Sequence, residues 1–220
     1  MSVMARTDDG SLREEMVATC RRMNASGINQ GTSGNLSVRC ADGILITPSS
    51  LPYDRMEAGD LVVLKADGSA EGKHRPSSEW RFHRDILDRR EDISVVLHCH
   101  SIHATTLAVH HKAIPAFHYM VAVAGGSSIR CSRYETFGTQ ELSDAALEAL
   151  EGRKACLLGQ HGQIALGTSL ESALWLAIEV ETLAHMYLAA LSIGEPPILP
   201  DEEIGRVLKK MDELRYAARP

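Results

Sequence analysis

Apolar runs long enough to cross a bilayer are the first thing this sequence lacks. No stretch approaches the roughly 20 consecutive apolar residues that a spanning helix needs, although 44% of the residues are hydrophobic. The first ten residues carry charges of both signs and lack the apolar stretch of a secretory signal. The sequence therefore predicts a cytoplasmic protein with no membrane partner.

Paired cysteines are missing as well. Five cysteines is an odd number, and no two form a Cys-x-x-Cys pair. They are scattered along the chain at Cys20, Cys40, Cys99, Cys131 and Cys156. This pattern argues against a disulfide framework and against a thiolate zinc knuckle, so we expect reduced thiols.

A cluster of positive charge is the third absence. The formal net charge is −6, and Lys and Arg do not gather in any segment, so no electrostatic footprint for nucleic acid is present. An anionic ligand would have to be held by backbone dipoles and single side chains. No linker, repeat or low-complexity tract divides the chain, which predicts one domain over residues 1–220 with a sizeable core.

Hydrophobic periodicity predicts a mixture of helices and strands. We expect helices at 11–26, 79–88, 140–150, 170–191 and 202–214, and strands at 35–39, 44–47, 61–65, 93–100, 116–120, 155–158 and 163–165. Ser11 is the expected N-cap of the first helix and Gly27 its stop, and residues 124–128 are typical of a flexible connection. The mixture favours an α/β domain whose central sheet is covered by helices.

Histidines at alternate positions of one strand provide the first chemical signal. Side chains two apart on a strand point to the same face, so His98 and His100 would project together, with Cys99 facing the opposite layer. Catalytic zinc sites use about three protein ligands, often imidazoles. His161 is the best third candidate, because it lies in a tight turn after an apolar strand. Spacing alone leaves His103 open as a ligand, and a hydrogen-bonded role without metal is the alternative for all of these residues.

The other histidines are better explained as ordinary core or surface groups. They are His74, His83, His110 and His111.

A carboxylate follows two serines at the start of the second predicted helix. The helix dipole by itself could favour a carboxylate at Glu79, with an effect of about 0.3–1 kcal/mol, and Ser77 and Ser78 could simply cap the helix. The same position can also hold a carboxylate beside a metal while backbone N–H groups bind an anion. The loop at 29–35 concentrates glycine, hydroxyl and amide groups before a strand, a weak signal for a phosphate site when taken alone.

Taken together, five motifs resemble the class II aldolase/adducin family over nearly the whole chain. They are Asn-Gln-Gly-Thr-Ser-Gly-Asn at 29–35, Ile-Thr-Pro-Ser-Ser at 46–50, Pro-Ser-Ser-Glu-Trp-Arg-Phe-His at 76–83, His-Cys-His at 98–100 and Gln-His-Gly at 160–162. Each motif alone is unspecific, but the set in this order is highly specific. The resemblance implies a single domain with a central, mostly antiparallel sheet flanked by helices.

The resemblance also assigns roles to individual residues. It implies a Zn²⁺ ion, or another divalent ion, held by His98, His100 and His161, with Glu79 as a fourth ligand that substrate displaces and that then acts as acid and base. The implied phosphate pocket comprises Thr32, Gly34, Asn35, Ser49, Ser50, Ser77 and Ser78. Tyr119 would reach the site from a neighbouring subunit to protonate the departing aldehyde, and Phe137 and Tyr216 would line the aldehyde end.

Within the family, the motifs are most similar to those of members that cleave L-fuculose 1-phosphate. They imply reversible cleavage of a ketose 1-phosphate to dihydroxyacetone phosphate and L-lactaldehyde, in a homotetramer with active sites between subunits. Deoxy- or methylthio-pentulose 1-phosphates, giving acetaldehyde or methylthioacetaldehyde, are an alternative. Pentulose-phosphate epimerases and dehydratases share the scaffold, as do non-catalytic adducin-like modules, which typically need no metal ligands.

Two features depart from the family pattern. Ser50 stands where fuculose-cleaving members carry glycine, which could alter one backbone contact to phosphate. The chain beyond Tyr216 also differs and could change which aldehyde is accepted.

Overall fold

A single mixed β-sheet forms the centre of the computed structural model, which describes residues 6–214 and 216. Within these residues the sheet has nine strands in the order β4-β3-β2-β1-β5-β9-β8-β7-β6. The strands are β1 (Asn35–Cys40), β2 (Gly43–Ile46), β3 (Val62–Leu64), β4 (Ala70–Glu71), β5 (Val95–Cys99), β6 (Ile114–Pro115), β7 (Ser128–Cys131), β8 (Ala155–Leu158) and β9 (Gly162–Gly167). Only β7 and β8 pair in parallel. The predicted α/β class with a mostly antiparallel sheet is confirmed.

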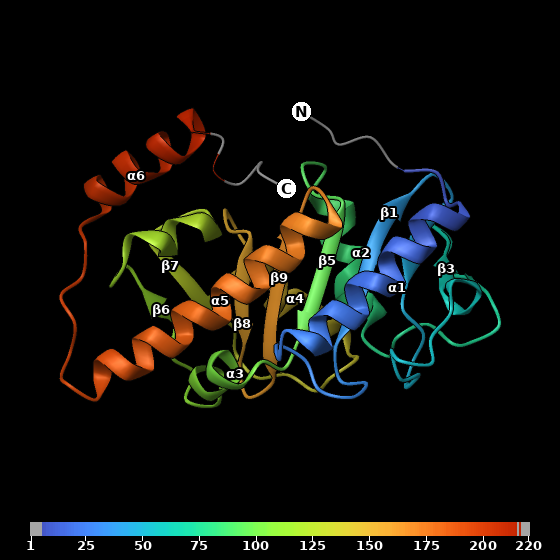
Figure 1. Cartoon of the computed structure of the whole chain (residues 1–220), viewed down its shortest axis with the longest axis horizontal. Helices are drawn as coiled ribbons and strands as arrows, with labels where there is room; N and C mark the ends of the chain where they lie inside the picture. Colours follow the sequence, from blue (N-terminus) through green and yellow to red (C-terminus); the bar gives the residue numbers. More distant parts are fainter. Residues whose placement is uncertain (1–5, 215, 217–220) are drawn as a thin grey trace.

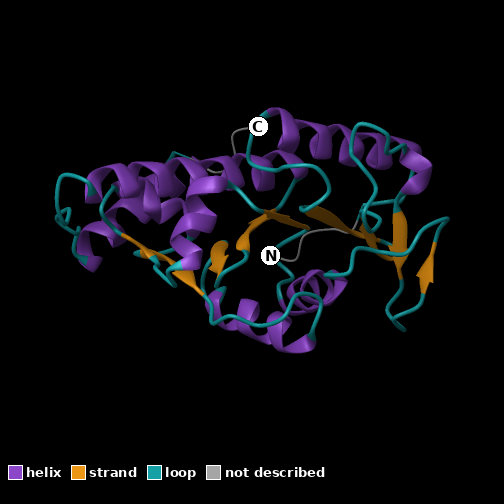
Figure 2. Ribbon diagram, turned by 90° about the horizontal axis from the view of Figure 1, so that it is seen from below, coloured by secondary structure: helices purple, strands orange, loops and turns teal. Residues whose placement is uncertain are grey.

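Helices cover both faces of the sheet, as Figures 1 and 2 show. The helices are α1 (Gly10–Ala25), α2 (Trp80–Arg89), α3 (Ile102–Val109), α4 (Gln140–Ala149), α5 (Leu170–Leu191) and α6 (Asp201–Glu213), with short 3-10 turns η1 (Ala58–Asp60) and η2 (Tyr119–Ala124). Helices α1, α3 and α5 share one core with the sheet, and α2 and α4 share another on the opposite face. Helix α6 packs mainly on η2.

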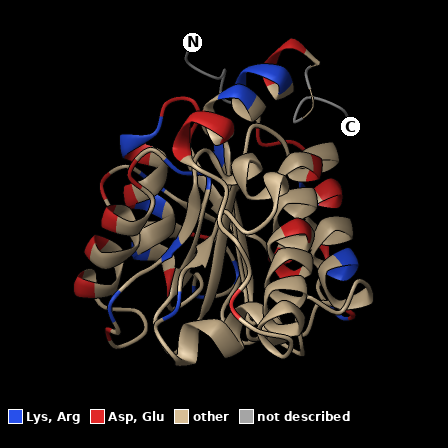
Figure 3. Cartoon of the chain, turned by 90° about the vertical axis from the view of Figure 1, so that its left-hand side faces the viewer, with Lys and Arg blue, Asp and Glu red and all other residues tan. Residues whose placement is uncertain are grey.

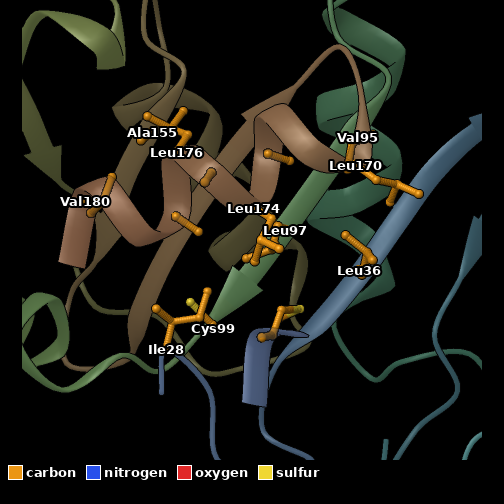
Figure 4. Close-up of a cluster of buried hydrophobic side chains, with 14 of the residues drawn as sticks. Ile28, Leu36, Val95, Leu97, Cys99, Ala155, Leu170, Leu174, Leu176 and Val180 are labelled. Atoms are coloured by element: carbon orange, nitrogen blue, oxygen red, sulfur yellow. The ribbon is translucent and has the colours of Figure 1, made fainter. Parts of the chain in front are cut away.

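Alternating side chains of β5 divide between the two cores. Val95, Leu97 and Cys99 are buried among α1 and α5 (Figure 4), whereas Val96 lies in the core beneath α2 and α4. His98 alternates with Leu97 and Cys99 and so faces the α2 side, because successive strand residues point to opposite faces. The prediction that Cys99 points away from the two histidines is therefore confirmed.

Helix α5 corrects one expectation from the sequence. By length and composition its 22 residues could cross a membrane, so an apolar segment of that length does exist. Here it packs along β9 and α3 and buries apolar residues such as Leu174, Val180 and Leu183. A core helix passes the same test, so the observation is weak support for a membrane role.

Several local predictions were wrong. Residues 116–120 do not form a strand, because the chain leaves β6 and coils as η2, which buries residues 120–124 between α5, α6 and β7. Asp9, not Ser11, caps α1 by accepting from the Leu12 N–H at 2.9 Å. Neither Ser77 nor Ser78 caps α2; the Ser77 hydroxyl accepts from the Glu79 N–H instead.

Acidic and basic side chains are interspersed on the side of the molecule shown in Figure 3. Elsewhere on the surface, exposed ion pairs include Arg22 with Glu171 and Arg133 with Glu148. Exposed pairs of this kind contribute little stability, about 0–1 kcal/mol each. In this view Lys and Arg lie on α6 and at several other places, with acidic residues among them.

Candidate active site

The strand order brings distant segments together at one end of the sheet. Strand β5 ends at Cys99 where β1 and β9 begin, because both neighbours run antiparallel to it. Asn35 pairs with His98 across β1 and β5, and His161 directly precedes β9. Helix α2 begins over the same end, which brings Glu79 to the strand ends.

Three imidazoles converge at this point. The Nε2 atoms of His98 and His100 are 3.1 Å apart, and the ring centroids of His98 and His161 are separated by 4.8 Å. One ligand atom from each of the three residues lies within 4.8 Å of the others. His98, His100 and His161 therefore form a cluster able to bind a metal ion.

The protonation of His98 is set by its neighbours. Its Nδ1 lies 2.9 Å from the backbone carbonyl of Gln163, and a carbonyl oxygen only accepts, so Nδ1 carries the hydrogen and the Nε2 lone pair faces the cluster. Burial lowers the pKa of His98 to about 3, with the nearby His100 adding to the effect. Burial likewise lowers the pKa of His161 to about 3. Neutral imidazoles are the form that binds metals.

Glu79 lies against two of these rings. Its Oε2 is 3.3 Å from His98 Nε2, and its Oε1 is 3.2 Å from His161 Nε2. Asn35 donates an amide hydrogen to Oε2 at 2.9 Å, whereas Oε1 is buried and has no hydrogen-bond partner among the described residues. A buried carboxylate oxygen left without a donor is costly, and a cation would satisfy it.

These distances fit a four-coordinate ion. Zinc bonds of about 2.0–2.1 Å in a tetrahedron place neighbouring ligand atoms roughly 3.3–3.4 Å apart. Three of the observed separations approach this length. They are 3.1 Å between His98 and His100, 3.3 Å between Glu79 and His98, and 3.2 Å between Glu79 and His161. Three imidazoles and one carboxylate are also donors of the type that zinc accepts.

His103 does not join the cluster. Its Nδ1 lies 2.7 Å from a Glu181 carboxylate oxygen, and its ring stacks on His185 with centroids 4.0 Å apart. Glu181 also accepts the backbone N–H groups of His103 and Ala104 and so caps the start of α3. Sequence spacing left open whether His103 is a ligand. Its contact with Glu181 of α5 holds it outside the cluster.

The predicted phosphate residues gather beside Glu79. Segments 47–49 and 75–77 run antiparallel, with the Ser49 N–H donating to the Arg75 carbonyl and the Ser77 N–H to the Thr47 carbonyl. Ser50 is adjacent, with its hydroxyl 3.4 Å from that of Ser49. Helix α2 starts here with no side-chain cap, and uncapped N–H groups at a helix start attract anions.

The loop 29–35 contributes two differently placed residues. Gly34 is packed so closely that a Cβ there would lie 2.4 Å from Asn29 Oδ1 and 2.7 Å from the His98 carbonyl. Only glycine allows the loop to approach β5 this closely. Thr32 lies exposed at the outer end of the loop.

The three predicted aldehyde-end aromatics are placed differently. Phe137 is exposed and adjoins Gly138, whose carbonyl accepts from Arg81 at 2.5 Å, so it lies near the start of α2. Tyr119 opens η2 beside β7, two strands from β9. The ring centroid of Tyr216 is 6.4 Å from that of Trp175. Trp175 lines a cavity with Leu166 and Gly167 at the far end of β9, about 17 Å along the strand from its start beside His161. Within one chain, Tyr119 and Tyr216 thus lie apart from the cluster.

Two further buried polar residues adjoin the site: Gln163 was not singled out in the sequence, and His83 is a hydrogen-bonded core group, as expected. Gln163 orients His98 through its carbonyl, and His83 accepts and donates hydrogen bonds next to Asn35. His83 is four residues after Glu79, which places both on one side of α2, and this spacing was the available signal.

The comparisons with known proteins decide the family. The family model for the class II aldolase and adducin N-terminal domain matches residues 14–188. The chain belongs to the class II aldolase family. It is 52% identical over 200 residues to a 5-methylthioribulose-1-phosphate/5-deoxyribulose-1-phosphate aldolase of Rhodospirillum rubrum, covering 91% of this chain and 90% of the relative.

Named fuculose enzymes are similar to nearly the same degree. An L-fuculose phosphate aldolase of Escherichia coli is 49% identical over 200 residues, covering 90% of this chain and 93% of the relative. A solved structure of L-fuculose 1-phosphate aldolase superposes with a TM-score of 0.90 at 37% identity, covering 93% of this chain and 97% of that one. With close relatives that are named aldolases, this class II aldolase is an enzyme of the lyase class.

We expect the metal-free aldolase to lose stability on acidification. The two imidazoles with folded pKa values of about 3 stay neutral, whereas in the unfolded chain they take up protons near pH 6.5. The unfolded state then binds more protons, so the free energy of unfolding falls between pH 7 and pH 5 by about 2 kcal/mol for each imidazole. Urea unfolding with chelator, at fixed protein concentration, measures the fall. His161→Gln should remove the contribution of that imidazole, about 2 kcal/mol of the fall, and a flat profile contradicts the expectation.

Ser50 gives a second test. Its φ of 61° lies in the left-handed region, where a side chain costs about 1–2 kcal/mol, an amount that exceeds the added chain entropy of glycine. Ser50→Gly should therefore raise the free energy of unfolding by about 0.5–1 kcal/mol in urea titrations. The matched control Ser49→Gly, at a neighbour without positive φ, should lower it. Equal shifts in the two variants would rule out relief of backbone strain.

Proposed function

We propose that this aldolase uses zinc to cleave a ketose 1-phosphate reversibly to dihydroxyacetone phosphate and a small aldehyde. The observation that carries the proposal is a buried carboxylate, Glu79, set among three imidazoles and next to a serine-rich turn at a helix start. L-Fuculose 1-phosphate, giving L-lactaldehyde, is the first candidate substrate. The relative at 52% identity favours a second, a 5-deoxy- or 5-methylthio-ribulose 1-phosphate.

His98, His100 and His161 would hold the ion, with Glu79 as the fourth ligand that substrate displaces. Zinc is our choice because of the three-imidazole donor set, and another divalent ion is the alternative. When bound, the ion supplies Lewis-acid stabilisation, worth several kcal/mol, of the negative charge that develops on the dihydroxyacetone phosphate half.

The protein's own residues move the protons. Cleavage breaks the bond between carbons 3 and 4 after the carbon 4 hydroxyl loses its proton, and carbon 3 must then gain one. Glu79 would exchange the proton at carbon 3, and its Oε1 is suited to this because no residue that the structure describes donates a hydrogen bond to it. Tyr119 of a neighbouring subunit would exchange the proton on the aldehyde oxygen.

Phosphate would bind in the pocket beside Glu79. Ser49, Ser50, Ser77 and Ser78 offer hydroxyls, and the uncapped start of α2 offers backbone N–H groups. Thr32, Gly34 and Asn35 would complete the pocket, and Phe137 and Tyr216 would line the aldehyde end. No cluster of Lys or Arg is needed for this mode of binding.

We further propose a homotetramer with active sites between subunits. Tyr119 is 47% exposed and lies apart from its own histidine cluster, which supports its delivery to a second chain. Ile102 and Val109 of α3 and Met186 of α5 also expose apolar surface on neighbouring helices, as expected of a subunit contact. We place the enzyme in the cytoplasm, without nucleic-acid or membrane partners.

A panel of ketose 1-phosphates tests the reaction. We expect release of dihydroxyacetone phosphate from L-fuculose 1-phosphate and from the deoxy- and methylthio-pentulose phosphates. Chelation should lower turnover by more than about 100-fold, and added zinc should restore it. A coupled assay for dihydroxyacetone phosphate measures both effects. Formation of an epimer or a dehydrated product instead, or full activity without metal, would sink the proposal.

Mixed oligomers test the roles of Glu79 and Tyr119. Glu79→Gln should retain metal yet lose most turnover, as should Tyr119→Phe, because each removes a proton-transfer group. Co-expression of the two variants in equal amounts should recover activity at about a quarter of the sites, those with an intact Glu79 from one chain and an intact Tyr119 from the next. The measurement is turnover per chain in oligomers purified through two different tags. A mixture no more active than either parent contradicts supply of Tyr119 from a second subunit.

A further inference from the structure

A chain of hydrogen bonds runs beneath Glu79 and ends at residues with no role in the proposed reaction. His83 of α2 is fully buried, and both of its ring nitrogens have partners. Nδ1 lies 2.7 Å from the Ser37 hydroxyl, and Nε2 lies 2.5 Å from Asn35 Oδ1. The other end of the Asn35 amide donates to Glu79 Oε2 at 2.9 Å. The side chains of four residues, each at most 5% exposed, therefore form one line.

The chemistry of these groups fixes every hydrogen in the line. Glu79 as a carboxylate only accepts, so the Asn35 NH₂ must face it and the amide oxygen must face His83. His83 then carries its hydrogen on Nε2, leaving Nδ1 to accept from the Ser37 hydroxyl. A flipped Asn35 amide would set its oxygen against the Glu79 carboxylate oxygen, and neither atom can donate.

The fold holds the line rigidly in place. Asn35 and Ser37 are two apart on β1 and so share the face toward α2. The His83 ring stacks on Phe82 with centroids 4.6 Å apart, and Phe82 in turn packs edge-on against His98. Burial lowers the pKa of His83 well below its usual value, in keeping with a neutral ring.

We propose that His83 and Ser37 are positioning residues that orient the Asn35 amide and thereby hold Glu79 Oε2, which leaves Oε1 free to exchange the substrate proton. This inference rests on the proposed role of Glu79. Neither residue touches substrate or metal in this scheme; both act through Asn35. Partners of this kind around a metal site typically contribute about 10–100-fold to activity or metal affinity.

The first test replaces the ring nitrogens while keeping a ring. His83→Phe should lower kcat by about 10–100-fold with KM and bound metal little changed, because Glu79 loses its orientation and the substrate and metal contacts remain. His83→Gln keeps an N–H donor for Asn35 Oδ1 and should recover most of kcat. Steady-state kinetics per bound metal ion measure both variants. The matched control is Ile86→Val, a buried change one turn along α2 that should leave kcat unchanged.

A double-mutant cycle tests the route through Asn35. In an Asn35→Ala background, His83→Phe should cause no further loss of kcat, because the link to Glu79 is already broken. Additive losses would overturn the proposal, as would a wild-type kcat per metal ion in His83→Phe.

Ser37→Ala, a smaller change, provides a test even if His83→Phe does not fold. It should lower kcat several-fold in the wild type and not in the Asn35→Ala background, and an equal loss in both would also overturn the proposal. Failure of the proposed function is distinguishable, because the unmodified enzyme would then release no dihydroxyacetone phosphate.

Discussion

Three imidazoles and one carboxylate crowd together at the end of β5, and the rest of the site is arranged around them. All four groups are largely withdrawn from water, and Glu79 Oε1 receives no hydrogen bond from the residues that the structure describes. Burial keeps the rings of His98 and His161 neutral by lowering their pKa values to about 3. Burying polar groups that are not fully hydrogen-bonded costs folding free energy, and apolar side chains in their place would avoid that cost. The presence of these groups is therefore explained by chemistry that needs a cation beside a carboxylate.

The antiparallel pairing of β5 with β1 and β9 makes this crowding possible. Strands β1 and β9 both begin where β5 ends, so residues from three distant segments of the chain meet at that end of the sheet. The two faces of β5 then have separate tasks. Cys99, Leu97 and Val95 anchor the strand in the core under α1 and α5, and His98 is left to face α2. A one-residue slip in register would exchange these faces, so the apolar core on one side fixes the ligands on the other.

A single chain holds only part of the predicted machinery. Phe137 lies near the start of α2, whereas Tyr119 and Tyr216 lie elsewhere on the chain, Tyr216 beyond the far end of β9. Exposed apolar residues of α3 lie just after the His-x-His pair. In the proposed homotetramer, assembly and catalysis would therefore depend on the same region of surface.

Much of the fold followed from local patterns in the sequence. Period-two and period-3.6 patterns located β8 and α5 with their observed bounds, and alternation placed Cys99 opposite its two histidine neighbours. Helix α3 was missed, because its start is capped by Glu181 from α5 and not by a neighbouring side chain. Residues 116–120 look like a strand by composition, yet the chain coils into η2 between α5, α6 and β7, which buries Ala116 and Met120 and leaves Tyr119 exposed.

The sequence by itself determined the kinds of group at the site and their local spacing: His-x-His on a strand, a carboxylate at a helix start and a histidine in a tight turn. Those features are local, set by backbone geometry over a few residues. Only the tertiary structure decided which groups meet, excluding His103 through its contact with Glu181 and joining His83 and Ser37 to Glu79 through Asn35. Hydrogen bonds between residues more than 40 positions apart depend on strand order and packing, and no short sequence pattern encodes them.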